Sequence, residues 1–174
     1  MKKISEKIMY NGVRFNVLQR KYKDNDKEYI RDIVDTKDAA IILPIDNSGN
    51  IIFLKQLREV VEEVMLELPA GIIEEGEEKE KAALRELEEE TGLKAQTIEH
   101  LISVYPSCGY TNEKIHIYLA KNFEKGKVNL DEDEHIQEVI KIKIEDAFYM
   151  LEKGDFKEAN VILALLMYKE KYMK

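Results

Sequence analysis

The strongest constraint on the fold is an acidic stretch, residues 74–90, whose carboxylates recur with the period of an α-helix. At 100° per residue, Glu86 and Glu90 lie about 40° apart on a helix, and Glu89 lies about 60° to the other side of Glu86. The neighbouring stripe is apolar, with Leu87 at its middle. Unpaired carboxylates beside a buried face are costly, so these three side chains need cations. Hard oxygen ligands of this kind suit Mg²⁺ or Mn²⁺.

The negative charge of the 174-residue chain is concentrated in two segments. The formal net charge is −8, while residues 74–90 hold nine acidic and three basic side chains and residues 131–134 hold four acidic ones. The rest of the chain therefore has a net charge of +2. Charge runs are commonly only solvated surface, and the helical spacing is what argues for a site in the first segment. An acidic protein of this kind is not expected to bind nucleic acid.

The sequence also predicts where the protein works. The longest wholly apolar run, residues 161–168, is far shorter than the roughly 20 residues of a membrane-spanning helix. The two N-terminal lysines are not followed by the apolar segment of a secretory signal. Cys108 is the only cysteine and cannot form an internal disulfide. We therefore expect a cytoplasmic protein without a membrane partner.

Turn signals and alternation divide the chain into an N-terminal β-meander, residues 1–37, and a main domain, residues 38–174. The dipeptide Asn11-Gly12 predicts a type I′ hairpin, and residues 24–26 predict a second turn. A ribbon this small cannot bury a core of its own. We therefore expect it to pack on the main domain or on a second subunit.

The main domain is predicted to mix helices and strands. Gly92 follows the acidic helix and suits the left-handed position after a helix C-terminus. The expected fold class is α/β, an α+β mixture with helices on both faces of a sheet. We expect strands at 39–45, 51–57, 65–68, 98–104, 114–120 and 136–144, and helices at 77–91, 145–152 and 158–171.

The residues in and around the acidic helix match a family motif. They occupy every fixed position of the Nudix box: Gly71, Glu77, Arg85-Glu86-Leu87, Glu89-Glu90 and Gly92. The chain thus resembles the Nudix hydrolases, which split a diphosphate linked to another moiety by metal-assisted attack of water. The resemblance implies an α/β/α sandwich around a mixed sheet. It also implies that Arg85 and Glu77 form a structural ion pair that orients the glutamates.

Other segments resemble the ADP-ribose pyrophosphatase branch of that family. They are Gln56-Leu57-Arg58, Glu67-Leu68-Pro69-Ala70-Gly71, residues 105–113 and residues 131–134. The branch resemblance implies cleavage of ADP-ribose, or a related nucleoside diphosphate sugar, to AMP and ribose 5-phosphate. Cys108 replaces the proline of the branch's Ser-Pro-Gly, and Leu57 replaces an aromatic residue. GDP-mannose, dinucleoside polyphosphates and oxidised nucleotides therefore stay open as substrates.

The resemblance implies a set of metal ligands. It makes Glu86, Glu90, Glu134 and the carbonyl of Ala70 ligands of Mg²⁺, for which Mn²⁺ can substitute, and it places Glu89 close to the same ions. Metal ions bound there would neutralise the carboxylates and let the site accept an anionic diphosphate. The cofactor expected is Mg²⁺.

The resemblance also implies a general base and substrate contacts. Glu132 is the expected base that takes a proton from water, and Glu113 is the rival base and a candidate substrate contact. Arg58 is expected to bind the phosphates, and Arg31 to reach the ligand of a partner subunit. The expected assembly is a homodimer through the N-terminal region.

One alternative belongs to a different functional class. Some Nudix-like domains bind a ligand without hydrolysing it, and such domains tend to lose carboxylates of the box. This chain keeps Glu86, Glu89 and Glu90, which favours an enzyme.

Overall fold

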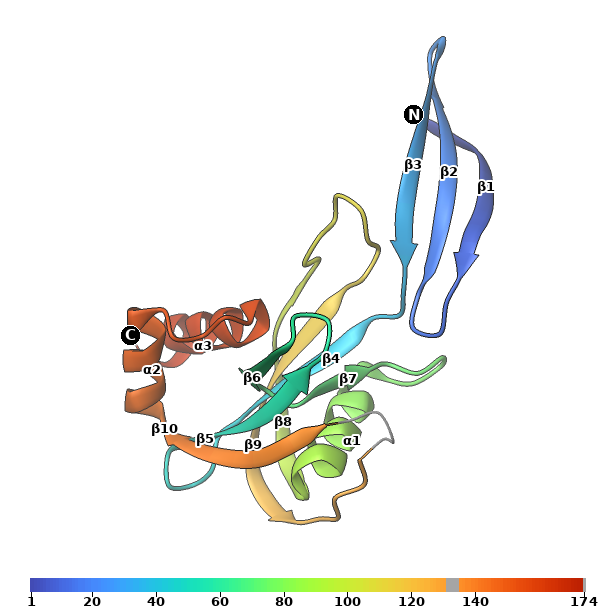
Figure 1. The fold of residues 1–174 in the computed structure, drawn as a ribbon. Helices are drawn as coiled ribbons and strands as arrows, with labels where there is room; N and C mark the ends of the chain where they lie inside the picture. Colours follow the sequence, from blue (N-terminus) through green and yellow to red (C-terminus); the bar gives the residue numbers. More distant parts are fainter. Residues whose placement is uncertain (131–134, 174) are drawn as a thin grey trace. The chain divides into compact units, whose positions relative to one another are not determined.

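The computed structural model describes residues 1–130 and 135–173, and Figure 1 shows its elements in chain order. The chain divides into two compact units. The first contains Met1–Ala39 and Val104–Ile115, and the second contains Ala40–Ser103 and His116–Lys174. Nothing in the sequence pattern predicted that residues 104–115 join the N-terminal strands. In the described part of the chain, no helix is long and apolar enough to cross a membrane.

The first unit is built on an antiparallel sheet with the strand order β1-β2-β3. Its strands are β1 (Lys2–Asn11), β2 (Asn16–Asp24) and β3 (Lys27–Asp35). Every residue of β1 is exposed, whereas Leu18 of β2 is buried. The segment 104–115 is tied to this sheet, since the N–H of Val34 donates to the carbonyl of Tyr110 across 2.8 Å.

The first hairpin is wider than predicted. Asn11 pairs with Asn16, and the N–H of Gly12 donates to the carbonyl of Phe15 across 3.1 Å. A type I′ turn requires positive φ at both central residues, and neither Asn11 nor Gly12 has it. The predicted two-residue turn is therefore wrong, because strand pairing stops at Asn11 and residues 12–15 make the connection.

The second unit combines two sheets with three helices. The strand orders are β10-β5-β6, which is antiparallel throughout, and β7-β4-β9-β8. The strands are β4 (Ala39–Pro44), β5 (Asn50–Arg58), β6 (Glu63–Glu67), β7 (Ala70–Ile72), β8 (Leu93–Val104), β9 (Ile115–Lys125) and β10 (Ile136–Lys143). The helices are α1 (Lys79–Thr91), α2 (Ile144–Lys153) and α3 (Ala159–Tyr172).

Each predicted element of the main domain is present, although several boundaries differ. The sequence analysis missed β7, which has three residues and is too short to show a period. It also began the strand β8 at residue 98, whereas β8 begins at Leu93, directly after the helix ends. The expected fold class, an α+β mixture, is confirmed.

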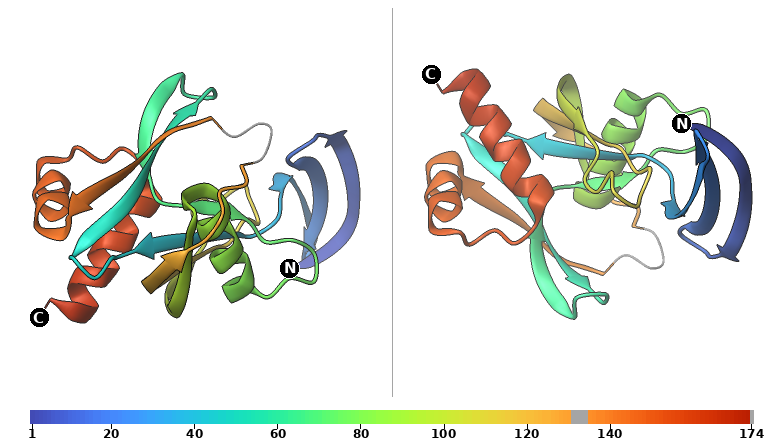
Figure 2. Two further views of the ribbon diagram at one scale, coloured as in Figure 1. Left: turned by 90° about the horizontal axis from the view of Figure 1, so that it is seen from below. Right: turned by 90° about the horizontal axis from the view of Figure 1, so that it is seen from above.

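The sheet that contains β4 and β9 is covered on both faces (Figures 1 and 2). On one face α1 buries Leu87 against Ile42 and Tyr118. Because side chains alternate along a strand, Ile41 points to the other face, on which α3 lies (Figure 2). Leu165 of α3 is fully buried. Burial of one such side chain contributes about 1.5–3 kcal/mol. This packing holds α1 rigidly beside the sheet.

Candidate functional site

The helix α1 begins two residues later than predicted and ends where predicted. Gly92 has a left-handed φ of 69°, and its N–H donates to the carbonyl of Glu88 across 2.8 Å. At the other end, Glu77 lies in the turn before the helix. Its carboxylate accepts a hydrogen bond from the N–H of Glu74 across 3.0 Å and also binds Arg85. These contacts hold Glu77 outside the helical hydrogen-bond pattern.

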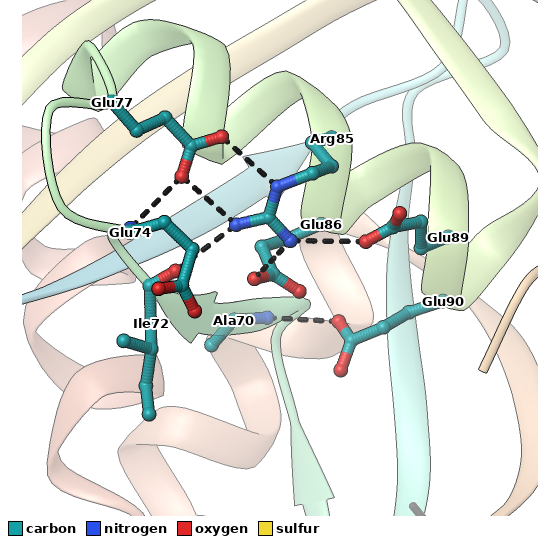
Figure 3. Close-up of polar contacts among 8 residues, drawn as sticks. All are labelled: Ala70, Ile72, Glu74, Glu77, Arg85, Glu86, Glu89 and Glu90. Carbon is teal, nitrogen blue, oxygen red and sulfur yellow. Dashed lines mark hydrogen bonds and ion pairs between the residues drawn. The ribbon is translucent and has the colours of Figure 1, made fainter. Parts of the chain in front are cut away.

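Arg85 connects most of the box residues (Figure 3). Its Nε and Nη2 donate to the two carboxylate oxygens of Glu77 across 3.0 and 3.1 Å, and Nη2 also donates to the carbonyl of Ile72 across 3.0 Å. Its Nη1 donates to Glu86 across 2.7 Å and to Glu89 across 3.0 Å. The hydrogen bond with Glu77 raises the pKa of Arg85 and lowers the pKa of Glu77. Arg85 and Glu77 thus form an ion pair that orients two box glutamates.

Two carboxylates of α1 are buried beside β7 (Figure 3). Glu86 is 7% exposed and Glu90 is 3% exposed. Oε2 of Glu90 accepts a hydrogen bond from the N–H of Ala70 across 2.9 Å. Gly71 leaves the space that Glu86 occupies, because a Cβ at position 71 would lie 2.0 Å from the carboxyl carbon of Glu86. Buried carboxylates in such a cradle are the oxygen donors that a hard divalent cation prefers.

The carboxylates of Glu86, Glu89 and Glu90 accept hydrogen bonds from donors of the protein itself. Within residues 1–130 and 135–173, no three acidic, His or Cys side chains form a group arranged to hold a metal ion. Arg85 binds Glu86 and Glu89, while the backbone N–H of Ala70 binds Glu90. The donor chemistry of these carboxylates fits a divalent cation.

The acidic segment 131–134 lies outside the described residues, and so do the predicted base Glu132 and the predicted ligand Glu134. The residues on either side of this segment make backbone hydrogen bonds. The N–H of Asn129 donates to the carbonyl of Glu89 across 2.9 Å, and the carbonyl of His135 accepts from the N–H of Leu57 across 3.3 Å. The chain thus leaves the end of α1 before this segment and rejoins β5 after it.

Arg58 forms a bidentate ion pair with Glu67, which the sequence analysis did not predict. Its Nε donates to Oε1 of Glu67 across 2.9 Å, and its Nη2 donates to Oε2 across 2.6 Å. Glu67 is 5% exposed. This hydrogen bond and the charges of Glu67, Glu90 and Glu158 raise the pKa of Arg58, while burial opposes the rise. The motif around Glu67 was recognised, but no sequence signal paired it with Arg58.

Arg31 and Glu113, the two remaining predicted site residues, belong to the first unit. The guanidinium of Arg31 lies 5.8 Å from the ring centre of Tyr29, and both residues line a cavity of about 560 Å³ within that unit. Burial and the nearby charge of Asp38 raise the pKa of Glu113. Cys108, one of the two residues that depart from the family pattern, lines the same cavity.

Comparison with known sequences finds a family match over most of the chain. The NUDIX domain matches residues 35–165. An ADP-ribose pyrophosphatase of Bacillus subtilis (strain 168) is 38% identical over 143 residues, which cover 81% of this chain and 77% of that protein. A methanol dehydrogenase activator of Bacillus methanolicus is 36% identical over 137 residues, which cover 78% of this chain and 74% of that protein.

Comparison with solved structures finds the same fold. The crystal structure of an ADP compounds hydrolase superposes with a TM-score of 0.86 and is 24% identical in sequence. The match covers 97% of this chain and 92% of the other. At this level of identity the likeness shows the fold.

Proposed function

The chain belongs to the NUDIX domain family, and we propose that it hydrolyses the diphosphate of ADP-ribose, or of a closely related nucleoside diphosphate sugar. Water adds across one phosphorus–oxygen bond of the diphosphate, so that the products are AMP and ribose 5-phosphate. The observation that carries the proposal is the pair of buried carboxylates, Glu86 and Glu90, held beside the backbone of residues 70–71. The similarity to the ADP-ribose pyrophosphatase of B. subtilis supports the substrate.

The proposed cofactor is Mg²⁺, with Mn²⁺ as a substitute. Glu86 and Glu90 would hold it, and the Ala70 carbonyl and Glu134 are the further ligands that the family resemblance implies. When bound, the metal supplies charge neutralisation at the phosphoryl oxygens and a lower pKa for the attacking water. Because a diphosphate is a polyanion, carboxylates alone would repel it, and this makes a divalent cation necessary at the site.

The side chains of the protein have separate parts in the proposed reaction. Arg85 orients Glu86 and Glu89 through its Nη1. Arg58 binds the phosphates of the substrate through its guanidinium group. Glu132 accepts the proton of the attacking water, and Glu113 is the alternative base. The raised pKa of Glu113 favours proton acceptance nearer to neutral pH.

We also propose that the protein acts in the cytoplasm as a homodimer through its N-terminal strands. The first unit exposes apolar side chains along β1, among them Ile8 at 59% exposure. Exposed apolar side chains are a common feature of surfaces that bind another protein. In the dimer, Arg31 would reach the ligand bound by the partner subunit. Sedimentation of the intact protein and of Ile8→Lys tests the assembly: the variant should sediment as a monomer.

The decisive assay is a panel of nucleotides offered with Mg²⁺ or Mn²⁺, with products identified by chromatography. ADP-ribose should yield AMP and ribose 5-phosphate. GDP-mannose, dinucleoside polyphosphates and oxidised nucleotides are the competing substrates. Because one relative is a methanol dehydrogenase activator, an alcohol dehydrogenase assay belongs in the same panel. Hydrolysis of none of these compounds would favour the non-catalytic, ligand-binding alternative.

Glu90→Gln tests the metal assignment directly. Loss of one buried ligand should lower turnover about a thousandfold or more, while the melting temperature stays close to that of the unmodified protein. Glu80→Gln is the matched control, because Glu80 is an exposed carboxylate on the same helix. Near-normal turnover in Glu90→Gln would refute the metal assignment.

A further inference from the structure

Arg58 and Glu67 form a bidentate ion pair in the second unit. Arg58 is the last residue of β5, and Glu67 is the last residue of β6. The side chain of Glu67 is 7% exposed, whereas that of Arg58 is 38% exposed. An isolated carboxylate as buried as Glu67 would lose most of its hydration without compensation, so it needs a paired cation. Arg58 supplies that cation, and Glu67 in turn restrains Arg58.

The restraint acts on one edge of the guanidinium group. Nε and Nη2 of Arg58 donate to the two oxygens of Glu67 across 2.9 and 2.6 Å. In the described part of the chain, Nη1 of Arg58 makes no hydrogen bond or ion pair. Because the guanidinium group is planar and rigid, holding one edge sets the direction of the remaining nitrogen.

Glu67 is itself held by the backbone around it. It pairs with Leu54 of β5 in the antiparallel ladder. Two residues further along, the carbonyl of Pro69 accepts a hydrogen bond from the N–H of Ile42 across 2.8 Å. The carboxylate therefore projects from a backbone fixed on both sides, which makes it a stable anchor for a longer side chain.

Arg58 also lies within electrostatic range of one carboxylate of α1. The charge of Glu90 acts on Arg58, as does that of Glu158. Glu158 caps α3 by accepting hydrogen bonds from the N–H groups of Asn160 and Val161. The guanidinium group is thus within the electrostatic range of one of the glutamates that hold the metal in the proposed function.

We propose that Glu67 is a positioning residue, which holds Arg58 by one edge so that Nη1 meets an oxygen of the substrate diphosphate. This inference rests on the proposed function, in which Arg58 binds the phosphates. An unrestrained arginine loses much of its side-chain entropy when it is ordered. With Glu67 in place, that ordering occurs when the protein folds and not when each substrate molecule binds.

The test is a double-mutant cycle with Glu67→Gln and Arg58→Ala. Glutamine has one acceptor oxygen and an NH₂ group that opposes the guanidinium donors, so it cannot hold both nitrogens. Glu67→Gln should lower kcat/KM for ADP-ribose about 10- to 100-fold, and Arg58→Ala at least as much. The double variant should be no worse than Arg58→Ala alone, because Glu67 acts only through Arg58.

Glu63→Gln is the matched control. Glu63 lies on the same strand and forms an exposed ion pair with Lys157. Its removal should leave kcat/KM unchanged. Losses in kcat/KM that multiply in the double variant would overturn the proposal, since Glu67 would then act independently of Arg58. A fall in melting temperature without any change in KM or kcat would also overturn it.

A second measurement on the same variants is the Kd of ADP, determined by calorimetry with Mg²⁺ present. This readout separates the two proposals. A protein that binds ADP and hydrolyses no nucleotide refutes the proposed function, while weaker ADP binding in Glu67→Gln would still support the positioning role. An equal Kd for Glu67→Gln and the unmodified protein overturns the positioning role, and so does an unmodified protein that fails to bind ADP.

Discussion

The N–H of Ala70 donates a hydrogen bond to the carboxylate of Glu90, across 2.9 Å and twenty positions of sequence. This contact joins β7 to the last turn of α1. The backbone next to it belongs to Gly71, whose missing Cβ leaves room for Glu86. The backbone of β7 and the two buried glutamates of α1 therefore form one rigid arrangement. A small change in the position of the strand should displace the carboxylates, and a change in the carboxylates should displace the strand.

Gly71→Ala tests how closely β7 and α1 must approach. The added Cβ would fall 2.0 Å from the carboxyl carbon of Glu86, so the carboxylate or the strand must move. We expect Mn²⁺ affinity, measured by calorimetry, to fall at least tenfold, because ligand placement sets metal affinity. Gly109→Ala is the control for stability, since a Cβ there meets nothing within 4 Å. Unchanged Mn²⁺ affinity in Gly71→Ala would separate Glu86 from the metal site.

Arg85→Lys tests the connecting role of the guanidinium group. Lysine keeps the charge, but one ammonium group cannot bind Glu77, the carbonyl of Ile72 and Glu86 at once. We expect the free energy of unfolding, measured in urea, to fall by about 2 kcal/mol. Lys81→Arg, in an exposed pair with Glu78, should change it little. Equal stability of the two variants would contradict the structural role of Arg85.

The two candidate bases can be separated by comparing Glu132→Gln with Glu113→Gln. If Glu132 takes the proton of water, its variant should bind Mn²⁺ normally and lose about a hundredfold or more in kcat. Glu113→Gln should then keep most of its activity. The reverse result would move the base to Glu113, whose raised pKa suits that part. The pH profile of kcat in each variant provides the measurement.

Asp46 should make stability depend on pH in the acid range. Burial opposes its ionisation, but hydrogen bonds from Asn50, Lys141 and Ser48 lower the pKa of Asp46 from 3.8 to about 2. A lowered pKa stabilises the folded state above the unfolded value of 3.8, and this stabilisation is lost as the pH falls toward 2. Asp46→Asn should therefore cost about 2 kcal/mol at pH 7 and progressively less below pH 4.

Unfolding in urea at several pH values checks this prediction. Glu138→Gln is the control, because Glu138 forms an exposed pair with Lys55, with their closest atoms 3.7 Å apart. Its effect on stability should be small at every pH. If the difference between Asp46→Asn and the unmodified protein stayed constant down to pH 2, the assigned hydrogen bonds would not account for the stabilisation.

The sequence by itself determined the features of this protein that depend on neighbouring residues. The period of the acidic stretch predicted α1, and Gly92 marked its end, because helix geometry and the left-handed cap are local properties of the chain. The fixed positions of the Nudix box, from Gly71 to Gly92, also indicated the family. The comparisons confirm that membership and the mixed fold.

Only the tertiary structure decided the features that join distant segments. The ion pair of Arg58 with Glu67 requires the pairing of β5 with β6, and residues 104–115 join the N-terminal strands by contacts that leave no pattern in the sequence. The turn at Asn11-Gly12 was predicted wrongly because the extent of strand pairing, and not the dipeptide, set the length of the loop. The period of a helix and its caps are determined by residues close together in the sequence. An ion pair between two strands instead depends on how the strands are arranged in the folded protein.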